Sequence, residues 1–315
     1  MHPDLLQMNA AALMDRVFTL YKDTFKMQIA FSIIMGIISI TLITLLVIFM
    51  TVGITFVLMA TYSVSDDDML LLVIVLILLA FLPIYVCWTY LATSGHILIS
   101  KQAFYGEQPI YLPFKESILA IFRVISTLIA QLVFSIPFIA LLFLSIYPFM
   151  TWQGGMLVFM NEIHPLLLIA VGLIYGVVYV VYSNLFALTV PVAIFEKRIF
   201  FDAVIRSYKL LKGDFWKIIG IRLLWFVITY VFSYSLQGLI VVVMMVAEAF
   251  AGTVIDVTYL MYVTMPLYFL ATMVVTVLVA PMDGIMTALI YFNQRIKKEG
   301  FDISVGIARL SRGLT

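Results

Sequence analysis

One acidic residue lies deep inside a long apolar stretch near the C-terminal end of the chain. Asp283 precedes Phe292, where that stretch ends, by nine residues, which places it about 14 Å inside the stretch at the rise of a helix. Burying a carboxylate there costs about 2.5–3.5 kcal/mol, so we expect it to face a bundle interior beside a partner, Arg222 or Arg123. Two interpretations stay open. In the functional interpretation, Asp283 relays an ion or proton or forms an internal site for a lipid headgroup. In the structural interpretation, its carboxyl group is protonated or paired and bonds to a carbonyl freed by Pro281.

The densest group of charges is basic and lies around the fifth apolar stretch. Clusters of four to eight bases beside a membrane attract anionic lipids, each base contributing about 1 kcal/mol. The alternative is that these bases only orient the chain in the membrane. Arg123 and Arg222 lie just inside apolar stretches and are better candidates for binding a lipid phosphate than the surface lysines, because a guanidinium can donate two parallel hydrogen bonds. The candidate lipid-headgroup ligands are Arg123, Arg206, Lys209, Lys212, Lys217 and Arg222.

Other polar side chains inside the apolar stretches are few and grouped. Asn184 is the second intramembrane polar candidate after Asp283, and it follows Ser183 and three tyrosines. Such groups can line a polar cavity. The alternative is hydrogen bonding between helices, at about 0.6 kcal/mol per bond. His96 is not expected to bind a metal, because no second His or Cys lies at ligand spacing.

Signatures of catalysis are missing from the sequence. There is no phosphate-binding GxxxxGK[ST], no HExxH and no GxSxG, and no pair of intramembrane carboxylates is placed for acid–base work. The single cysteine, Cys87, has no partner for a disulfide. We therefore expect a non-enzymatic protein with no cofactor and no metal.

Helices that cross a membrane must position these residues. The chain is 64% apolar and 11% charged, whereas soluble chains carry about 25% charged residues. The predicted fold class is an all-α, polytopic integral membrane protein with six transmembrane helices, forming a single membrane domain over residues 1–315. Each predicted span has the ~20 residues that a crossing needs. The six apolar stretches are roughly 28–60, 69–99, 118–150, 165–195, 218–249 and 265–292.

The basic residues predict the orientation. All 18 Lys and Arg residues can be placed on one side of the membrane, because residues 61–68, 151–164 and 251–264 contain none. The positive-inside rule then places both termini in the cytoplasm. The first 26 residues mix charges with apolar residues, so no cleavable signal is expected and the first span is retained.

Internal similarity predicts three pseudo-repeats, each a short amphipathic segment followed by a helical hairpin. The segment 16–26 (RVFTLYKDTFK) aligns with 206–216 (RSYKLLKGDFW), and 114–123 (FKESILAIFR) is a shorter copy. We expect these segments to form short interfacial helices on the cytoplasmic side, with Gly213 as a break before the fifth span. In residues 201–212 the apolar side chains Phe201, Val204, Ile205, Tyr208 and Leu211 follow helical spacing. The predicted repeats are about 1–105, 106–199 and 200–302, followed by a tail, 303–315.

Four segments together resemble a bacterial family, the glycerophosphoryl diester phosphodiesterase membrane domain. They are LMDRVFTLYKDTF (13–25), PVAIFEK (191–197), RSYKLLKGDFWKI (206–218) and YFNQRIKKEGFD (291–302). The resemblance implies a membrane domain that occurs either fused to a catalytic barrel or alone. The catalytic barrel of the phosphodiesterases would need ~250 further residues. The His-Arg-Gly signature of these phosphodiesterases is also absent from this sequence. The resemblance therefore implies a stand-alone membrane domain without phosphodiesterase activity.

These observations lead to two functional hypotheses. The first is a non-enzymatic scaffold or accessory subunit of the bacterial inner membrane that binds anionic phospholipid, a partner membrane protein, or both. The alternative is a transporter or channel component whose pathway runs near Asp283, since transporters also combine quasi-symmetric hairpins with a midplane polar residue. No nucleic acid is expected as a partner.

Overall fold

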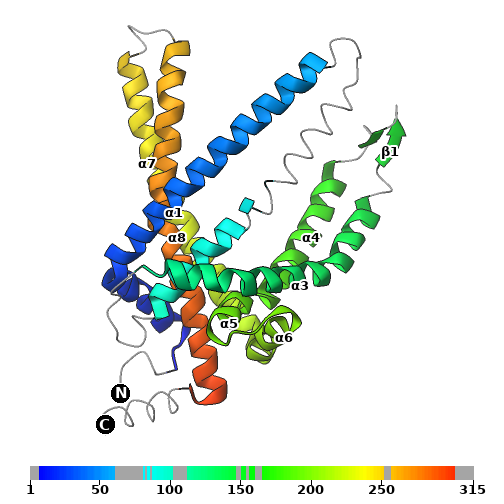
Figure 1. Cartoon of the computed structure of the whole chain (residues 1–315), viewed down its shortest axis with the longest axis vertical. Helices are drawn as coiled ribbons and strands as arrows, with labels where there is room; N and C mark the ends of the chain where they lie inside the picture. The colour runs from blue at the N-terminus through cyan, green and yellow to red at the C-terminus, as the bar shows by residue number, and fades with distance from the viewer. Residues whose placement is uncertain are drawn as a thin grey trace. The chain divides into compact units, whose positions relative to one another are not determined.

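The computed structural model describes residues 7–60, 81, 84–85, 87–101, 112–146, 150–153, 156–159, 165–251 and 257–301. These residues are helical apart from one short hairpin and a few turns (Figure 1). The helices are α1 (Ala10–Ala60), α3 (Phe114–Ile146), α4 (Pro165–Leu185), α5 (Thr189–Phe195), α6 (Phe200–Leu211), α7 (Phe215–Ala251) and α8 (Val257–Glu299).

The hairpin was not among the predicted elements. Its strands, β1 (Met150–Gln153) and β2 (Met156–Phe159), are antiparallel, with Met150 opposite Phe159. The sequence between them is Gly154–Gly155, a dipeptide typical of two-residue hairpin loops. That dipeptide between apolar residues is the signal in the sequence for this element.

The helices have the length and composition of a membrane-embedded protein. Among the described residues, five helices are long and apolar enough to cross a membrane: Ala10–Gly53, Phe114–Phe138, Ile169–Phe195, Phe215–Val243 and Tyr268–Glu299. About half of the predicted second span, 69–99, lies outside the described residues, and the end of this span belongs to a helical segment, 87–101.

The chain divides into two compact units. Unit 1 contains Met1–Ile121 and Leu223–Leu289, and unit 2 contains Phe122–Arg222 and Ile290–Thr315. In unit 1 a core of Phe31, Met35 and Ile99 joins α1 to the helical segment 87–101. In unit 2 the buried side of α6 consists of Ala203, Val204, Ser207, Leu210 and Leu211.

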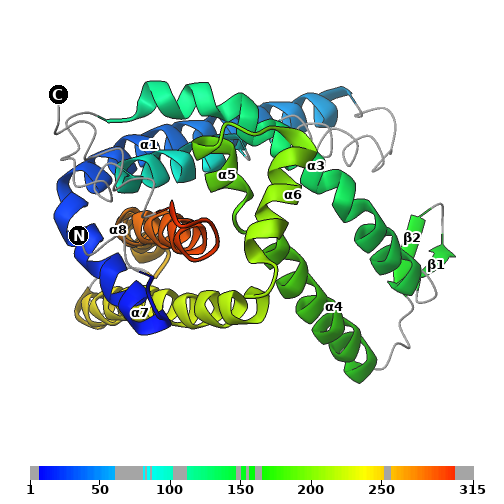
Figure 2. The ribbon, with the colours of Figure 1, turned by 90° about the horizontal axis from the view of Figure 1, so that it is seen from below.

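Of the three segments predicted to form short interfacial helices, one forms a separate helix, α6. α6 is a helix of 12 residues that ends before Gly213, whose φ is +94°, a value that favours glycine because it has no Cβ. The N-terminal segment instead continues into the first span as α1, a helix of 51 residues, which Figure 2 shows bent but uninterrupted. The segment at 114–123 likewise belongs to α3. Neither segment has a glycine at the position of Gly213, so neither helix is interrupted there.

Candidate functional site

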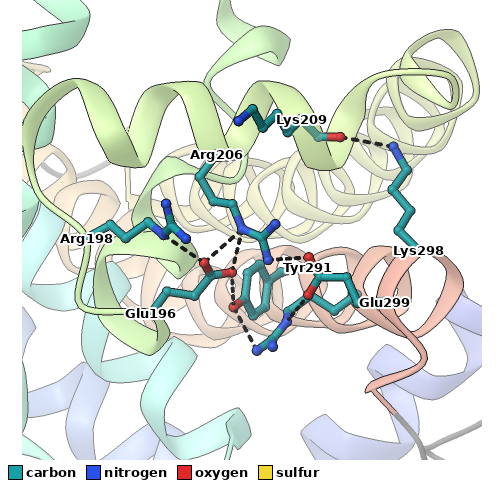
Figure 3. Close-up of polar contacts among 8 residues, drawn as sticks. Glu196, Arg198, Arg206, Lys209, Tyr291, Lys298 and Glu299 are labelled. Atoms are coloured by element: carbon teal, nitrogen blue, oxygen red, sulfur yellow. Dashed lines mark hydrogen bonds and ion pairs between the residues drawn. The ribbon is translucent and has the colours of Figure 1, made fainter.

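A network of charged side chains joins α5, α6 and α8 within unit 2 (Figure 3). Glu196, the residue after α5, accepts from Arg206 Nε at 2.8 Å to Oε2 and 3.0 Å to Oε1. Arg198 Nε donates to Glu196 Oε2 at 3.1 Å, and the Tyr291 hydroxyl donates to Oε1 at 3.1 Å. The Glu196 side chain is 12% exposed, so these donors replace most of the water that a free carboxylate would bind.

A second carboxylate closes this network into a ring. Glu299, at the end of α8, pairs with Arg206 Nη2 and accepts from Arg295 Nε at 3.0 Å. Arg295 Nη1 in turn donates to the Tyr291 hydroxyl at 3.3 Å. We call Glu196, Arg206, Glu299, Arg295 and Tyr291 the ion-pair ring. The ring links residues more than ninety positions apart in sequence and so fixes α6 to the end of α8.

Arg206 is the residue that both carboxylates share. Burial alone would lower the pKa of its guanidinium, but hydrogen bonds and charge attraction from Glu196 and Glu299 outweigh burial and raise that pKa above its ordinary value. Its side chain is only 18% exposed. Arg206 was predicted as a lipid-headgroup ligand. The structure shows its guanidinium bound by two carboxylates of the same chain, which is the geometry of a structural ion pair.

Two lysines of α8 hold the turn that follows α6. Lys298 Nζ donates to the carbonyl oxygens of Lys209 and Lys212, which lie in the last turn of α6 and at its C-cap. Lys297 Nζ pairs with Asp214, the residue after Gly213. The last carbonyls of a helix have no partner within the helix and attract cations. The Gly213 turn is therefore attached to α8 on both sides.

The remaining bases of this region are exposed. Lys209, Lys212 and Lys217 are all exposed, as a headgroup ligand must be. The five apolar residues predicted to form one face of α6 in fact form two. Val204 and Leu211 are buried in the protein, whereas Phe201, Ile205 and Tyr208 form an exposed outer strip. Trp216, just after α6, is 74% exposed. Unit 2 thus presents three lysines beside an aromatic strip.

The predicted fourth span is interrupted where Asn184 lies. α4 ends at Leu185 and α5 begins at Thr189, with a turn between them. Arg222 Nη1 donates to Asn184 Oδ1 at 2.8 Å, and Asn184 Nδ2 donates to the Val180 carbonyl. The Ser207 hydroxyl donates to the Leu185 carbonyl at 3.3 Å. The Leu185 carbonyl at the break is therefore bonded by a side chain, and the bonds that Asn184 makes to Arg222 and Val180 support a structural role for Asn184 and Arg222.

Arg123 lies on α3 and is partly buried. Among the described residues, its Nη1 atom is buried without a hydrogen-bond partner. The Ser126 hydroxyl donates to the Arg123 carbonyl at 2.7 Å and accepts from the backbone N–H of Phe200. Arg123 is thus set beside the start of α6, and its role as a headgroup ligand stays a prediction.

Asp283 lies in unit 1, where the indole N–H of the buried Trp225 donates to its Oδ1 at 2.8 Å. The residue is exposed, whereas the sequence suggested an interior position. Its neighbours Met282 and Ile285 occupy the packed face of α8, so the helical repeat turns Asp283 to the same side as the exposed Ala280. The expected ion pair with Arg222 or Arg123 stays a prediction.

A buried polar network surrounds His96 in the same unit. His96 Nδ1 lies 2.7 Å from Gln28 Oε1, and Nε2 lies 3.4 Å from the Ser32 hydroxyl. Because Gln28 Oε1 can only accept, Nδ1 carries the hydrogen and Nε2 accepts from Ser32. The Ser100 hydroxyl donates to the His96 carbonyl at 2.7 Å. Each polar group of His96 has a partner inside the unit, which is the arrangement of helix-to-helix bonding.

Sequence reasoning missed Glu196, Glu299, Tyr291 and Arg295 as members of one cluster. The signal was the repeated pattern after the even spans, where an acid stands among bases in both FEKR (195–198) and RIKKE (295–299). Across the described part of the chain, no three His, Cys, Asp or Glu residues are grouped as a metal site would require. No protein-family model, no curated protein and no solved structure matches this chain.

Proposed function

We propose that this protein is a non-enzymatic scaffold or accessory subunit of a bacterial inner membrane that binds anionic phospholipid at its cytoplasmic face. The proposal includes six spans in three hairpins with both termini in the cytoplasm, in keeping with the distribution of Lys and Arg. The resemblance of four segments to the phosphodiesterase membrane-domain family is part of the same proposal. A partner membrane protein is a second occupant of this face.

The observation that carries the proposal is the pairing of exposed bases with exposed aromatic rings on α6 and at the start of α7. Lys209, Lys212 and Lys217 are exposed, as are Tyr208 and Trp216. Tyr and Trp concentrate at the level of lipid headgroups, and lysines beside them attract anionic headgroups. The ion-pair ring supports the proposal by keeping α6 in a fixed position, so that the three lysines stay together.

The test is a variant with Lys209→Gln, Lys212→Gln and Lys217→Gln. Native mass spectrometry of the purified protein with phosphatidylglycerol or cardiolipin measures how much lipid is retained. We expect retention to fall strongly, because three contributions of about 1 kcal/mol each are removed. Arg206 is left intact, since its replacement would change stability as well as charge.

The matched control replaces three other exposed lysines, Lys22, Lys26 and Lys115, by glutamine. It lowers the formal charge equally, so general attraction to anionic lipid weakens equally in both variants. Loss of lipid confined to the α6 variant supports a specific site. Equal loss in both variants would mean that Lys209, Lys212 and Lys217 only help to orient the chain in the membrane.

The alternative function, a transporter or channel component, is favoured by the interrupted α4–α5 span, since broken helices line transporter sites. In a transport site the freed carbonyls would be open to an ion. Here the Leu185 carbonyl is already bonded by Ser207, which favours the scaffold. The alternative is tested by the growth phenotype of Asp283→Asn, because a transport carboxylate must change its protonation or partner, and asparagine cannot titrate.

A further inference from the structure

Unit 1 contains an apolar groove that none of the roles above uses. It has a volume of about 500 Å³ and is a wide-open groove at the surface of the unit, not an enclosed space. Its described lining is Ile38 and Leu42 of α1, Ile84 together with Cys87, Trp88 and Leu91 of the helical segment 87–101, and Ile121 of α3. The volume falls within the range of small-ligand sites, about 300–1,000 Å³.

The described part of the lining offers no free, strong hydrogen-bonding group to a polar ligand. Among the described lining groups the one strong donor is the indole N–H of Trp88, which donates to the Ser39 hydroxyl and is therefore already satisfied. An ordered water needs about two to four polar partners, and apolar cavities stay dry without them. Neither water nor a charged group therefore fits this space.

The position of the groove identifies what fills it. Ile38 and Leu42 lie in the membrane-spanning part of α1, and Ile121 lies in that of α3. The medium beside these helices is hydrocarbon. An empty groove would forfeit the dispersion contacts of its walls, and an acyl chain entering from the bilayer restores them without desolvating any polar group.

We propose that this groove is a binding site for one acyl chain of a membrane lipid, selected by its hydrocarbon and not by its headgroup. The site does not involve Lys209, Lys212 or Lys217, so the proposal stands if headgroup binding fails. A zwitterionic lipid is therefore the appropriate probe. It has no net charge, so its binding to the groove does not depend on whether the lysines bind anionic lipid.

The experiment uses the full-length protein in bilayers that contain phosphatidylcholine with a diazirine in its acyl chain. Light converts the diazirine into a carbene that inserts into neighbouring side chains, and mass spectrometry maps the products. We expect residues 38–42 and 87–91 to be labelled several-fold more than residues 226–231 of α7, which carry the exposed side chains of Phe226 and Val231. Equal labelling of these stretches means ordinary surrounding lipid only and overturns the proposal.

Two variants and one modification test occupancy directly. Cys87→Phe fills the groove and should remove the excess labelling, whereas Val227→Phe, at an exposed position of α7, should leave it unchanged. Because Cys87 is the single cysteine of the chain, an alkyl methanethiosulfonate can attach a short alkyl group there in the folded protein, without any refolding. Excess labelling that survives both Cys87→Phe and this modification contradicts the proposal.

Discussion

The indole N–H of Trp225 donates a 2.8 Å hydrogen bond to Oδ1 of Asp283. Trp225 is buried and Asp283 is exposed, so the bond joins a packed side chain to the one carboxyl group of the apolar part of α8. The bond needs an acceptor oxygen and not a negative charge. Substitutions at Asp283 can therefore separate the role of the hydrogen bond from the role of the charge.

Asp283→Asn should change stability little, because the amide oxygen still accepts from Trp225. Asp283→Leu should lower the free energy of unfolding by about 1–3 kcal/mol, since the buried indole N–H loses its acceptor. Thermal unfolding of both variants measures the difference. A loss of about 3–5 kcal/mol in both points instead to a broken ion pair with Arg222 or Arg123.

Arg206 and Lys209 share the charged side of α6 and should behave differently. Arg206→Gln should lower the free energy of unfolding by about 1.5–3 kcal/mol, because two carboxylates lose a charged donor. Lys209→Gln should stay within about 0.5 kcal/mol, since its ammonium group is exposed. Chemical or thermal denaturation of the purified proteins checks this. Equal stability of the two variants would show that the ion-pair ring contributes little.

Gly284→Ala should destabilise unit 1. A Cβ built there would lie 2.5 Å from Cβ of His96, so a helix must shift, at about 1–3 kcal/mol. Gly172→Ala is the control, because no atom lies within 4 Å of its added Cβ and alanine improves helix propensity by up to about 1 kcal/mol. Unfolding temperatures should therefore move in opposite directions. A drop at Gly172 would indicate that another helix packs on that face.

Cysteine labelling tests the topology. In a Cys87→Ala background, single cysteines at Asp67, Asn161 and Gly252 should react with an impermeant maleimide added from outside, because their connections contain no Lys or Arg. A cysteine at Gln108 should react only after the membrane is opened. These four positions lie outside the described residues, so the prediction rests on the sequence. Outside labelling at Gln108 would overturn the six-span topology.

The sequence correctly predicts that α6 is a separate helix that ends before Gly213, but it wrongly predicts a separate helix at the N-terminal copy, 16–26. Both outcomes have one reason. At the aligned positions Lys212–Gly213–Asp214 corresponds to Lys22–Asp23–Thr24. Gly213 adopts φ +94° and ends its helix, whereas Asp23 has a Cβ and stays in α1. The amphipathic pattern is shared by both copies. A single glycine therefore decides whether the segment forms a separate helix.

The ion-pair ring was beyond the sequence analysis because its members are far apart in the chain. Glu196 and Tyr291 are 95 residues apart, and only the packing of α5 against α8 brings them together, as the stacked rings of Phe195 and Phe292 show. Counting Lys and Arg residues along the sequence treats each base as if it had no carboxylate partner. It cannot show that Arg206 and Arg295 are neutralised by carboxylates of the same chain while Lys209 is not.

The closed form of the ion-pair ring makes it tolerant of single losses. Each of its five members bonds to two others, so removing any member except Arg206 opens the ring into a chain that still joins α6 to α8. Single substitutions will accordingly understate what the ring contributes, and pairs of substitutions will be non-additive. A change at any member except Arg206 leaves α6 attached to α8 through the remaining bonds, whereas loss of Arg206, the one ring member on α6, releases α6 from the ring.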